Sequence, residues 1–517
     1  MAYSQDDLKR FIARRHPEYG DSLEHWNFLE ATYHGGREWF GANIFRYIKE
    51  GETEFKERLA RCYRFNHTRE CVDLVQKYIF KSAIVRNETD APEEIKRFWK
   101  EASLSGLDID QFMRLVSTLS SIFGRVWVFV DSNKSSEIVT KADEKNSDSR
   151  VYAYIVKPQN ILDMGFDDSG KLRWILVRET VRDDDDPITS SGEVKEQFRL
   201  WTRDEWMTFE QSEDENGNGI VVMTGNGENP IGKVPCFHVD HVIGEHKYSA
   251  PGLINDIAYL DRAVANYLSN LDAIIQDQTF SQLVMPAQNL MPGEDKYDKL
   301  IEMGTKRIFI YDGEGGSKPD YISPDPTQAE LIITAVNKII NEIYHTIGMA
   351  GERTKEDNAV GIDNSSGVAK AYDFERVNSL LAAKADSLEN AENELVEFVL
   401  AWHDKTEVED ELVKYPDTFD VRSLFDEFTI AEKLMMIKAP DGVRREQMTQ
   451  VMDKLFPRIA ADLRKSMEEE LKTWPPDPIE EAAAMAEATQ PPQPTGNTSN
   501  RNPQTAKRQG QVTSATK

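Results

Sequence analysis

Apolar side chains recur every three or four residues over three early stretches of the chain, which is the pattern of an amphipathic helix. These stretches cover residues 21–32, 55–85 and 108–123. Between the first two, Gly35 and Gly36 interrupt the pattern within a run of aromatic residues that extends from Tyr33 to Phe40. We interpret this run as a loop that docks on the core. The chain is therefore expected to be mainly helical up to about residue 120.

The period of the pattern changes to two between about residues 125 and 245, which predicts strands. Acidic and glycine-rich turn segments, at 167–170, 183–187 and 215–219, separate the strand-like stretches. Such turns are typical of hairpins, so we expect an antiparallel meander whose hairpin tips are solvated. The expected strands are residues 126–130, 151–156, 172–178, 197–202, 206–210 and 220–224.

Two long helices with heptad-like apolar seams are expected further along, at residues 253–278 and 326–347. Strand-like pieces at 282–285 and 307–311 lie in the insertion between them. We expect a neighbouring copy in a closed ring to cover the seams, because one subunit would not bury both. The alternative is an ordinary helical hairpin that packs on its own domain. The seam residues are Leu253, Ile257, Leu260, Val264, Tyr267, Leu271 and Ile274 in the first helix, and Ile333, Val336, Ile340, Ile343 and Ile347 in the second.

The stretch from Gly348 to Gly367 is polar and without periodicity, which predicts a mobile loop. A very long helix is expected after it, with Phe374, Leu381 and Leu388 among the apolar residues of one face. A strand at 413–421 and helices at 423–438 and 444–471 should follow. Beyond residue 474 the composition turns to Ala, Pro, Gln, Asn, Thr and Ser, which predicts a disordered tail that is basic at its end.

The 517 residues include 62 Lys and Arg against 90 Asp and Glu, a formal net charge of −28. Proteins that hold duplex DNA present basic surfaces, so the chain as a whole is not expected to bind DNA tightly. A passage through which DNA slides without sticking is compatible with this charge, but the charge alone favours an ordinary acidic protein. No apolar run is long enough to cross a bilayer, and the N-terminus lacks a secretory signal pattern. The odd set of Cys62, Cys71 and Cys236 favours folding in a reducing cytoplasm.

Sequence patterns for catalysis are missing from the chain. Gly170-Lys171 and Gly232-Lys233 are followed by Leu and Val, so neither could place a hydroxyl on magnesium as a phosphate-binding loop does. We interpret His238, His241 and His246 as structural, because no partner residue lies at zinc spacing. The acidic run 183–186 is interpreted as a solvated turn. We therefore expect no catalytic residue, no metal and no cofactor.

Several short phrases, in a particular order of elements, resemble the portal (head–tail connector) proteins of tailed bacteriophages. The first long helix follows two such phrases: a strand phrase, Ile-Gly-Lys-Val-Pro-Cys-Phe at 231–237, and then Ser-Ala-Pro-Gly at 249–252. Tyr-Ile-Ser-Pro at 321–324 closes the insertion, and Ser-Gly-Val-Ala-Lys-Ala at 366–371 opens the very long helix. The acidic hairpin at about 183–195 departs from the family pattern.

The resemblance implies a portal-like α+β fold, mainly helical, with an antiparallel β wing, long stem helices, a small αβ clip and a helical C-terminal crown. Its parts would be the wing at 1–245, a first stem helix at 246–280, the clip at 281–322 and a second stem helix at 323–347. These would be followed by a tunnel loop at 348–366, a long wing helix and strand at 367–422, the crown at 423–474 and a disordered tail at 475–517.

The function that the resemblance implies is that of a virion component at one capsid vertex, assembled in the host cytoplasm. Copies of the chain would form a ring, usually dodecameric in this family, that encloses the channel for DNA packaging and ejection. Double-stranded DNA would pass without sequence-specific contacts. The protein partners would be the terminase large subunit, the head–tail adaptor, and the major capsid and scaffolding proteins. A membrane, a cofactor and an enzymatic activity are not expected.

The tunnel loop supplies the candidate site. Arg353 and Lys355 would touch the phosphate backbone, with Glu352 and Asn358 beside them. Further acidic residues leave the loop net acidic, so each contact should be weak and transient. Two other classes of protein stay open: another structural virion protein, such as a minor head protein, and a metal-dependent phage enzyme that acts on DNA.

Overall fold

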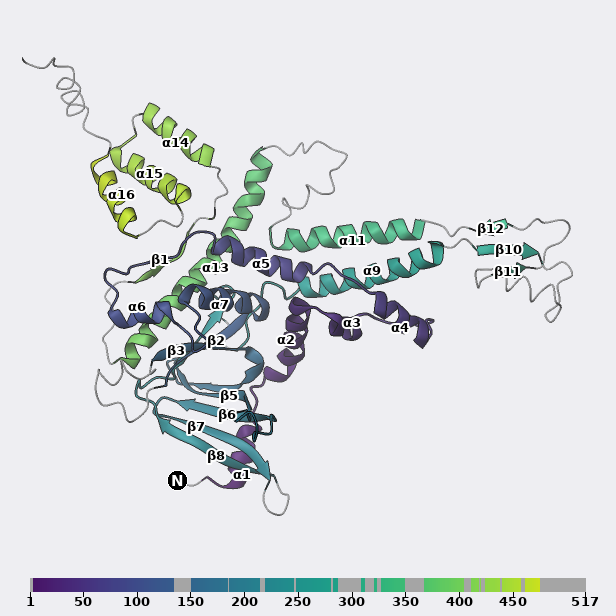
Figure 1. Ribbon diagram of the computed structural model, residues 1–517, viewed down its shortest axis with the longest axis horizontal. Helices are drawn as coiled ribbons and strands as arrows, with labels where there is room; N and C mark the ends of the chain where they lie inside the picture. The colour runs from purple at the N-terminus through teal and green to yellow at the C-terminus, as the bar shows by residue number, and fades with distance from the viewer. Residues whose placement is uncertain are drawn as a thin grey trace, which may run out of the picture. The chain divides into compact units, whose positions relative to one another are not determined.

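The computed structural model describes residues 3–133, 150–184, 186–213, 219–245, 248–279, 282–286, 308–311, 320–322, 327–348, 367–403, 411–417, 419, 424–437, 439–456 and 461–474. The chain divides into two compact units, Met1–Asp420 and Val421–Lys517. The first unit combines helices with mostly antiparallel sheets (Figure 1). The predicted α+β class is therefore confirmed.

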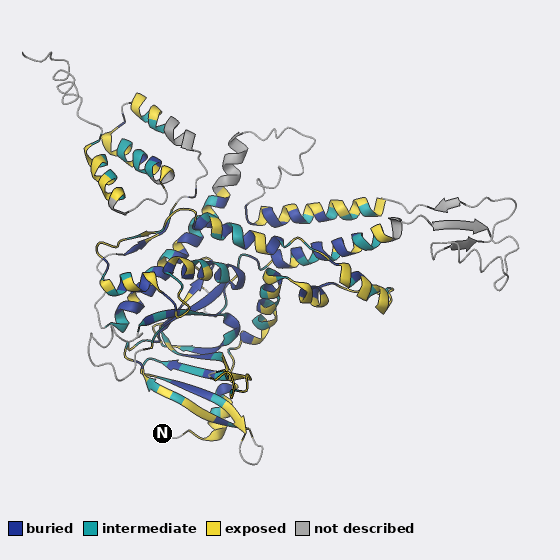
Figure 2. Ribbon diagram, viewed as in Figure 1, coloured by how far each residue is buried: buried dark blue, intermediate teal, exposed yellow. Residues whose placement is uncertain are grey.

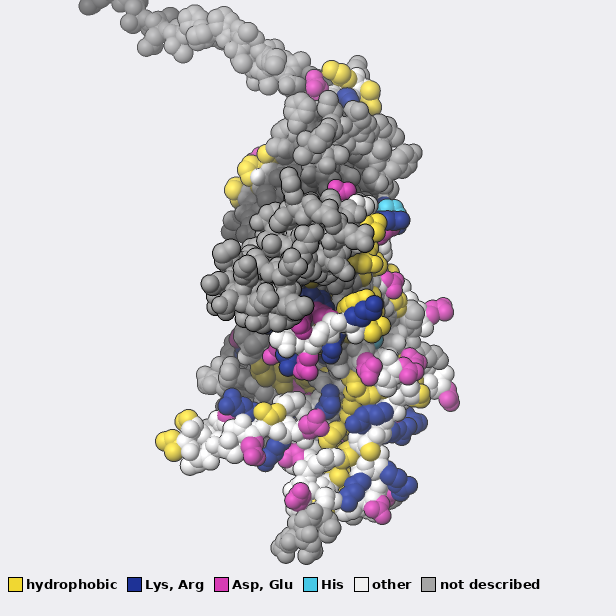
Figure 3. Space-filling model, turned by 90° about the vertical axis from the view of Figure 1, so that its right-hand side faces the viewer, with side chains coloured by type: hydrophobic (Ala, Val, Ile, Leu, Met, Phe, Trp, Pro, Cys, Tyr) yellow, Lys and Arg dark blue, Asp and Glu magenta, His cyan; other side chains and the backbone are white. Residues whose placement is uncertain are grey.

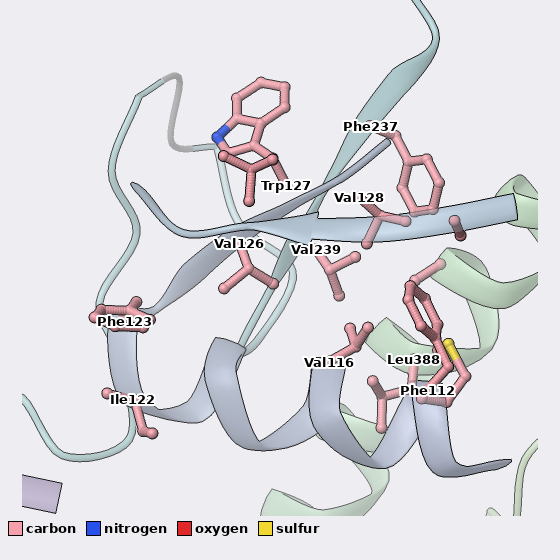
Figure 4. Close-up of a cluster of buried hydrophobic side chains, with 14 of the residues drawn as sticks. Phe112, Val116, Ile122, Phe123, Val126, Trp127, Val128, Phe237, Val239 and Leu388 are labelled. Atoms are coloured by element: carbon pink, nitrogen blue, oxygen red, sulfur yellow. The ribbon is translucent and has the colours of Figure 1, made fainter. Parts of the chain in front are cut away.

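The core of the first unit lies around a three-stranded antiparallel sheet of order β3-β2-β9. Its central strand is buried on both faces, since each side chain from Val126 to Val130 is at most 2% exposed. Phe112 and Val116 of one helix and Leu388 of another point toward the sheet (Figure 4). The strands are β2 (Arg125–Ser132), β3 (Val151–Val156) and β9 (Cys236–Asp240), and the helices are α7 (Ile109–Phe123) and α13 (Gly367–Trp402).

The turn from α7 into β2 requires glycine. Gly124 has φ +82°, and a Cβ atom at this position would lie only 1.8 Å from the carbonyl oxygen of Ala250. The segment after Ala250 passes close to the same turn, because the Leu253 N–H donates to the Ser121 carbonyl oxygen (2.9 Å). The His241 N–H donates to the Gly124 carbonyl oxygen (2.6 Å). Backbone contacts therefore join this turn to both β9 and the start of the next long helix.

A second sheet is a meander of five strands that follow one another in space as in sequence, which confirms the predicted meander for this part of the chain. Two corrections apply: β2, β3 and β9 form a separate sheet, and β4 had not been predicted. The N-terminal helix α1 (Gln5–Ile12) lies beside the edge strand, where the Gln5 side-chain amide exchanges two hydrogen bonds with the Val221 backbone (2.9 and 3.0 Å). The five strands are β4 (Ile161–Phe166), β5 (Leu172–Arg182), β6 (Val194–Thr202), β7 (Glu205–Glu213) and β8 (Gly219–Glu228).

The acidic hairpin between β5 and β6 is a hydrogen-bonded turn. Asp183 accepts hydrogen bonds from the N–H and the hydroxyl of Ser191 (3.1 and 2.7 Å). Asp186 accepts from the N–H groups of Ile188 and Thr189 (2.7 and 3.0 Å). These bonds hold the pKa of both carboxyl groups below the usual range. The carboxylates thus organise the turn that the sequence had suggested only as a solvated tip.

The N-terminal helices are more broken than the periodicity predicts. Only Gly35 and Gly36 interrupt the helix pattern in the aromatic run, since helix α3 already begins at Arg37. The single helix expected over 55–85 is two helices, and Asn66 caps the second by accepting a hydrogen bond from the Arg69 N–H (3.0 Å). Of the strand expected over 413–421, the described residues form a two-residue pair with β1, and residues 418, 420 and 421 lie outside the described residues. These elements are α2 (Tyr19–His34), α3 (Arg37–Asn43), α4 (Glu52–Arg61), α5 (His67–Ile79), β1 (Val85–Arg86), α6 (Glu93–Lys100) and β13 (Val413–Lys414).

An antiparallel pair of long helices, α9 (Ile257–Thr279) and α11 (Thr327–Thr346), extends from this body (Figure 1). The chain between them forms a three-stranded sheet of order β11-β10-β12. Strand β10 (Gln282–Pro286) is parallel to β11 (Ile308–Tyr311) and antiparallel to β12 (Asp320–Ile322). The predicted helix–small sheet–helix arrangement is confirmed, and we refer to the two helices as the hairpin.

The described part of the second unit comprises α14 (Leu424–Met436), α15 (Asp441–Leu455) and α16 (Ala461–Thr473). The sequence had predicted one helix where α15 and α16 are separate. Among the described side chains of this unit, Val451 is 2% exposed, whereas Met436 and Ile437 are 72% and 73% exposed. In the part of the chain that the structure describes, no helix of either unit is long and apolar enough to span a bilayer.

Candidate functional site

Helix α9 is the central member of a layer of helices. It contacts α11 along one side, and α2, α4 and α5 on other sides. Figure 2 shows the result: α9 is largely buried or half-buried, whereas the outer face of α11 is exposed. The hairpin therefore has one covered helix and one helix with an open face.

The predicted seams are covered within the subunit. Ile257 and Val264 of α9 are fully buried, as is Ile343 of α11, because the two helices pack on each other and on the body. Our expectation that the seams need a neighbouring copy is therefore wrong for most of their length, and the alternative of a hairpin packed on its own domain is correct. Two positions stay open, Tyr267 (39% exposed) and Ile333 (47% exposed).

A buried carboxylate fixes the root of α9. Asp261 is 0% exposed and accepts hydrogen bonds from the N–H and the hydroxyl of Thr68 in α5 (3.2 and 2.8 Å). The Arg64 guanidinium lies 3.6 Å from the same carboxylate and stacks 4.0 Å from the ring centre of Trp39. Burial lowers the pKa of Arg64, and the nearby Asp261 opposes that shift. These contacts join α9 to α3 and α5 at a single point.

The root of α11 is held by a tyrosine. Tyr344 is 4% exposed, and its hydroxyl donates a hydrogen bond to the Glu70 carboxylate of α5. His67 Nδ1 lies 3.1 Å from the same hydroxyl oxygen. Both helices of the hairpin are therefore anchored through polar contacts to α5, which fixes their direction relative to the body.

The segment between α3 and α4, residues 44–50, lies against the middle of α9, and we call it the 44–50 loop. Arg58 of α4 is 4% exposed and makes two hydrogen bonds of 2.7 Å to the Glu50 carboxylate. It also donates to the Phe45 carbonyl oxygen (3.0 Å) and to the Ser269 hydroxyl of α9 (2.7 Å). The Arg58 hydrogen bonds lower the pKa of Glu50. One buried guanidinium thus fixes the loop to the hairpin.

The long helix α13 carries buried polar groups where it crosses the core. Lys384 is 0% exposed, and its ammonium donates to the Ser120 hydroxyl of α7 (2.5 Å). Burial lowers the pKa of Lys384 to about 7, and the charge of Asp240 opposes the shift only in part. The Ser387 hydroxyl donates to the Asp240 carbonyl oxygen (2.7 Å), while the Asp240 carboxylate pairs with Arg125 (2.6 and 2.8 Å). These contacts set the position of α13 on the sheet.

The predicted DNA-facing residues Arg353, Lys355, Glu352 and Asn358 lie outside the described residues. The structure does place both ends of this stretch. A Cβ atom added to Gly348 would lie 3.3 Å from the Arg376 side chain and 3.5 Å from the Val377 backbone nitrogen. The chain after α11 and the first part of α13 are therefore adjacent.

Two of the three histidines considered as metal ligands, His238 and His241, lie among core residues. His238 packs beside Trp127 (5.5 Å between ring centres), and burial together with Arg125 lowers its pKa to about 4. His241 is 6% exposed and lies 3.3 Å from the Ser121 hydroxyl, whereas His246 is outside the described residues. Over the described ranges, no group of three His, Cys, Asp or Glu side chains is arranged to hold a metal ion. All three cysteines are buried and free.

The surface that faces along the hairpin from its far end is of mixed character. Figure 3 shows Lys and Arg side chains there interleaved with Asp, Glu and hydrophobic ones. On this face the described residues form no field of a single sign. Sequence reasoning missed the 44–50 loop, Asp261 and Lys384, because none of them belongs to a motif.

Comparisons with known proteins give weak likenesses of fold. No known protein family matches the sequence, and no curated protein matches it either. Three solved structures align over most of their length with TM-scores of 0.35–0.37. One is a chain from the neck of an empty gene transfer agent (GTA) particle with C6 symmetry, at 10% identity over 77% of this chain and 97% of that chain. A second is from the virion of a native GTA particle, at 11% identity over 77% and 92%.

The third structure is a chain from the neck of a native GTA particle with C12 symmetry, with 11% identity over 80% of this chain and 98% of that chain. TM-scores below 0.5 do not establish a shared fold or a shared role. The functional proposal therefore depends on the elements and contacts of this chain.

Proposed function

We propose that this chain is the portal subunit of a tailed phage or a phage-like particle, a component of the ring at one capsid vertex. The observation that carries the proposal is the order of elements: helix α9, a small sheet, the antiparallel return helix α11, residues 349–366, and the 36-residue helix α13 through the core. This is the stem, clip, stem, tunnel loop and long helix order of the family that the sequence resembles.

The anchoring of the hairpin supports a structural role. A hairpin that lines a channel must keep its direction while a polymer moves past it. Asp261 and Tyr344 fix α9 and α11 separately to α5, so the hairpin is held at two points on its root. Buried polar contacts of this kind set a single arrangement, because any displacement leaves a charge or a donor unpaired.

The charge of the hairpin supports passage rather than binding. Helix α9 contains three aspartates against one arginine, and α11 contains two glutamates against one lysine. Counterion release from phosphates requires clustered Lys and Arg, so these helices would not hold duplex DNA. The 353–358 segment, with Arg353 and Lys355, would make the phosphate contacts, and Glu352 and Asn358 would lie beside them.

The remaining assignments follow from the same proposal. Residues 281–322 would form the clip that docks the terminase large subunit during packaging and the head–tail adaptor afterwards. The wing, residues 1–245, would contact the major capsid and scaffolding proteins, and residues 423–474 would form the crown. The ring would be homo-oligomeric and dodecameric, in the virion, with ATP hydrolysis supplied by the terminase.

Electron microscopy of the purified full-length protein tests the proposal. End-on views should show rings with a central hole about 20 Å or more across, roughly the width of duplex DNA with room to slide. Chains that stay monomeric or dimeric at all salt concentrations would overturn it. In that case, a divalent-ion-dependent activity on DNA would favour the enzyme alternative, and co-purification with heads lacking a ring would favour a minor head protein.

A further inference from the structure

Large hydrophobic side chains are exposed on two sides of helix α9: on the 44–50 loop and on helix α11. The three most exposed ones among the described residues of the first unit are Ile48 (95%), Ile188 (91%) and Leu331 (70%). Ile188 lies on the acidic hairpin of the five-stranded sheet, but the other two lie beside α9. In a monomer such side chains would be left to water, and exposed apolar side chains that gather into a patch mark interaction sites.

Ile48 is part of an apolar patch on the 44–50 loop. Phe45 and Tyr47 of the same loop are 60% and 62% exposed. The Arg262 guanidinium of α9 lies over the rings of Phe45 (5.4 Å) and Tyr259 (5.0 Å), which extends the patch onto α9. Phe45 and Tyr259 therefore lie against the same guanidinium, and Tyr47 and Ile48 follow Phe45 closely in the chain.

The loop is rigid, which is what an interface requires. The Arg58 guanidinium donates hydrogen bonds to the Glu50 carboxylate and to the Phe45 carbonyl oxygen. The Glu50 N–H donates to the Tyr47 carbonyl oxygen (3.0 Å). A patch that is ordered before binding loses little conformational entropy when a partner covers it. The hydrogen bonds therefore present Tyr47 and Ile48 in a fixed position.

The second exposed surface is the outer face of α11. An exposed row runs along this helix at three-and-four spacing, and Ile333 (47% exposed) lies beside it. Helix α9 separates this face from the 44–50 loop, since α9 contacts α4 and α11, and the order α11, α9, α4 is visible in Figure 1. The row consists of Gln328, Leu331, Thr334, Lys338, Asn341 and His345.

The two surfaces are also complementary in charge. The loop carries Arg46 and Lys49, while its acidic residue, Glu50, is paired with Arg58. The half of α11 that contains Leu331, residues 327–337, has Glu330 as its only charged residue. The basic 44–50 loop thus matches the half of the α11 face that presents Leu331, Ile333 and Glu330, whereas the other half of that face carries Lys338 and polar side chains.

We propose that the 44–50 loop of one copy docks on the outer face of α11 in the next copy. Two different surfaces on different sides of one chain give a head-to-tail contact, and such contacts generate a ring when the rotation closes. This inference rests on the ring proposed above and assigns the contact that builds it. Ile48 and Tyr47 lie at its centre, with Leu331 and Ile333 opposite them.

Cysteine cross-linking between copies tests the contact directly. A single cysteine at Ile48 is mixed with single cysteines along the α11 row, in the variants Leu331→Cys, Thr334→Cys and Asn341→Cys, and oxidised. Cys62, Cys71 and Cys236 are buried, so they give little background. We expect Ile48→Cys to cross-link with one or two neighbouring α11 positions and not with itself. A 48–48 product alone would mean a two-fold contact and would overturn the proposal.

A charged substitution gives the second test. Ile48→Asp should raise the concentration at which half of the chains are assembled by at least about tenfold, the effect of about 1.4 kcal/mol per interface. Ile188, in the acidic turn between β5 and β6, is about as exposed as Ile48. Ile188→Asp is therefore the matched control and should assemble as the unmodified chain does. Both variants should keep the circular dichroism and melting temperature of the parent, because both side chains lie in solvent.

The outcomes separate the two proposals. Rings of the unmodified chain that persist unchanged in Ile48→Asp would overturn the docking contact and leave the portal proposal standing. Absence of rings in the unmodified chain would instead overturn the portal proposal. Loss of rings in Ile48→Asp but not in Ile188→Asp, with cross-links from 48 to α11, is the expected result.

Discussion

The ammonium of Lys384 donates its hydrogen bond to the Ser120 hydroxyl in a part of the core that excludes water from both side chains. The Ser120 hydroxyl in turn donates to the Val116 carbonyl oxygen (2.7 Å). Its donor is therefore satisfied without the lysine. Among the described residues, by contrast, the hydrogen-bond partner of the lysine is a neutral oxygen, so burial lowers the pKa of Lys384 to about 7.

We predict that Lys384→Met stabilises the protein at pH 7. Since the folded pKa of Lys384 is about 7 and its unfolded value is near 10.5, the unfolded chain binds more protons between these two values. The stability of the unmodified protein should thus rise as the pH increases from about 7 to about 10, by at most about 1.4 kcal/mol per pH unit. Lys384→Met should gain about 1–4 kcal/mol at pH 7 and lose this rise.

Denaturant unfolding at pH 7, 8 and 9 measures the effect. Lys77→Met, which removes an exposed lysine from α5, is the control and should change the free energy of unfolding by less than about 0.5 kcal/mol. A destabilised Lys384→Met protein with an unchanged pH profile would contradict the pKa assignment.

At the root of α9, we predict that Asp261→Ala is strongly destabilising. The substitution leaves the Arg64 charge buried and removes the acceptor for the Thr68 N–H and hydroxyl. Loss of one partner from a buried pair lowers the free energy of unfolding by about 3–5 kcal/mol. Asp272 lies in the same helix as Asp261, but its ion pair with Arg61 of α4 is more exposed. Asp272→Ala breaks that pair and should change the free energy of unfolding by no more than about 1 kcal/mol. Equal effects of the two variants in thermal unfolding would refute the anchoring role.

The rigidity of the 44–50 loop can be tested by limited proteolysis. Glu50→Ala removes the carboxylate that Arg58 holds, so the loop should open and trypsin should cut after Arg46 and Lys49 several times faster than in the unmodified chain. Glu57→Ala removes an exposed carboxylate from α4 and serves as the control. Cleavage at the same rate in both variants would show that the loop does not depend on Arg58. Ring assembly should weaken in Glu50→Ala even though Ile48 is intact.

For the proposed DNA contact, we predict that the double variant Arg353→Ala/Lys355→Ala packages or retains several-fold less DNA while rings still form. The two side chains would supply most of the positive charge near the strand, and phosphate contacts act independently of sequence. Nuclease-protected DNA per particle measures the effect. Lys77→Ala/Lys171→Ala removes two exposed bases elsewhere and should package normally. Missing rings in the double variant would contradict the assignment of these residues to the channel.

The sequence predicted most elements because their apolar spacing is a local property. The ends of α9, α11 and α13 lie within a few residues of the expected positions. Periodicity failed where capping decides the outcome. Residues 55–85 read as one helix, yet the Asn66 side chain caps a new helix and the chain turns before it. A short polar residue before an apolar run was the available signal.

Packing partners could not be predicted in the same way. The seam residues Val264 and Ile340 identify a face, but the spacing does not say whether the partner belongs to the same chain or to the next one. The structure shows that the partner is in the same chain. Likewise, Lys384 and Asp261 are charged residues in amphipathic patterns, and only the tertiary fold shows that they are buried. The tunnel-loop residues stay a prediction.

The turn at Gly124 has a mechanical consequence. A backbone hydrogen bond from Leu253 to Ser121 connects the chain just before α9 to the end of α7, and one from His241 to Gly124 connects the turn after α7 to the end of β9. A load along α9, such as drag from a polymer sliding past it, would reach the sheet as shear across these short bonds and the Asp261 anchor together. The hairpin is therefore fixed at its root, and its displacement under such a load should be largest at the end that is farthest from the body.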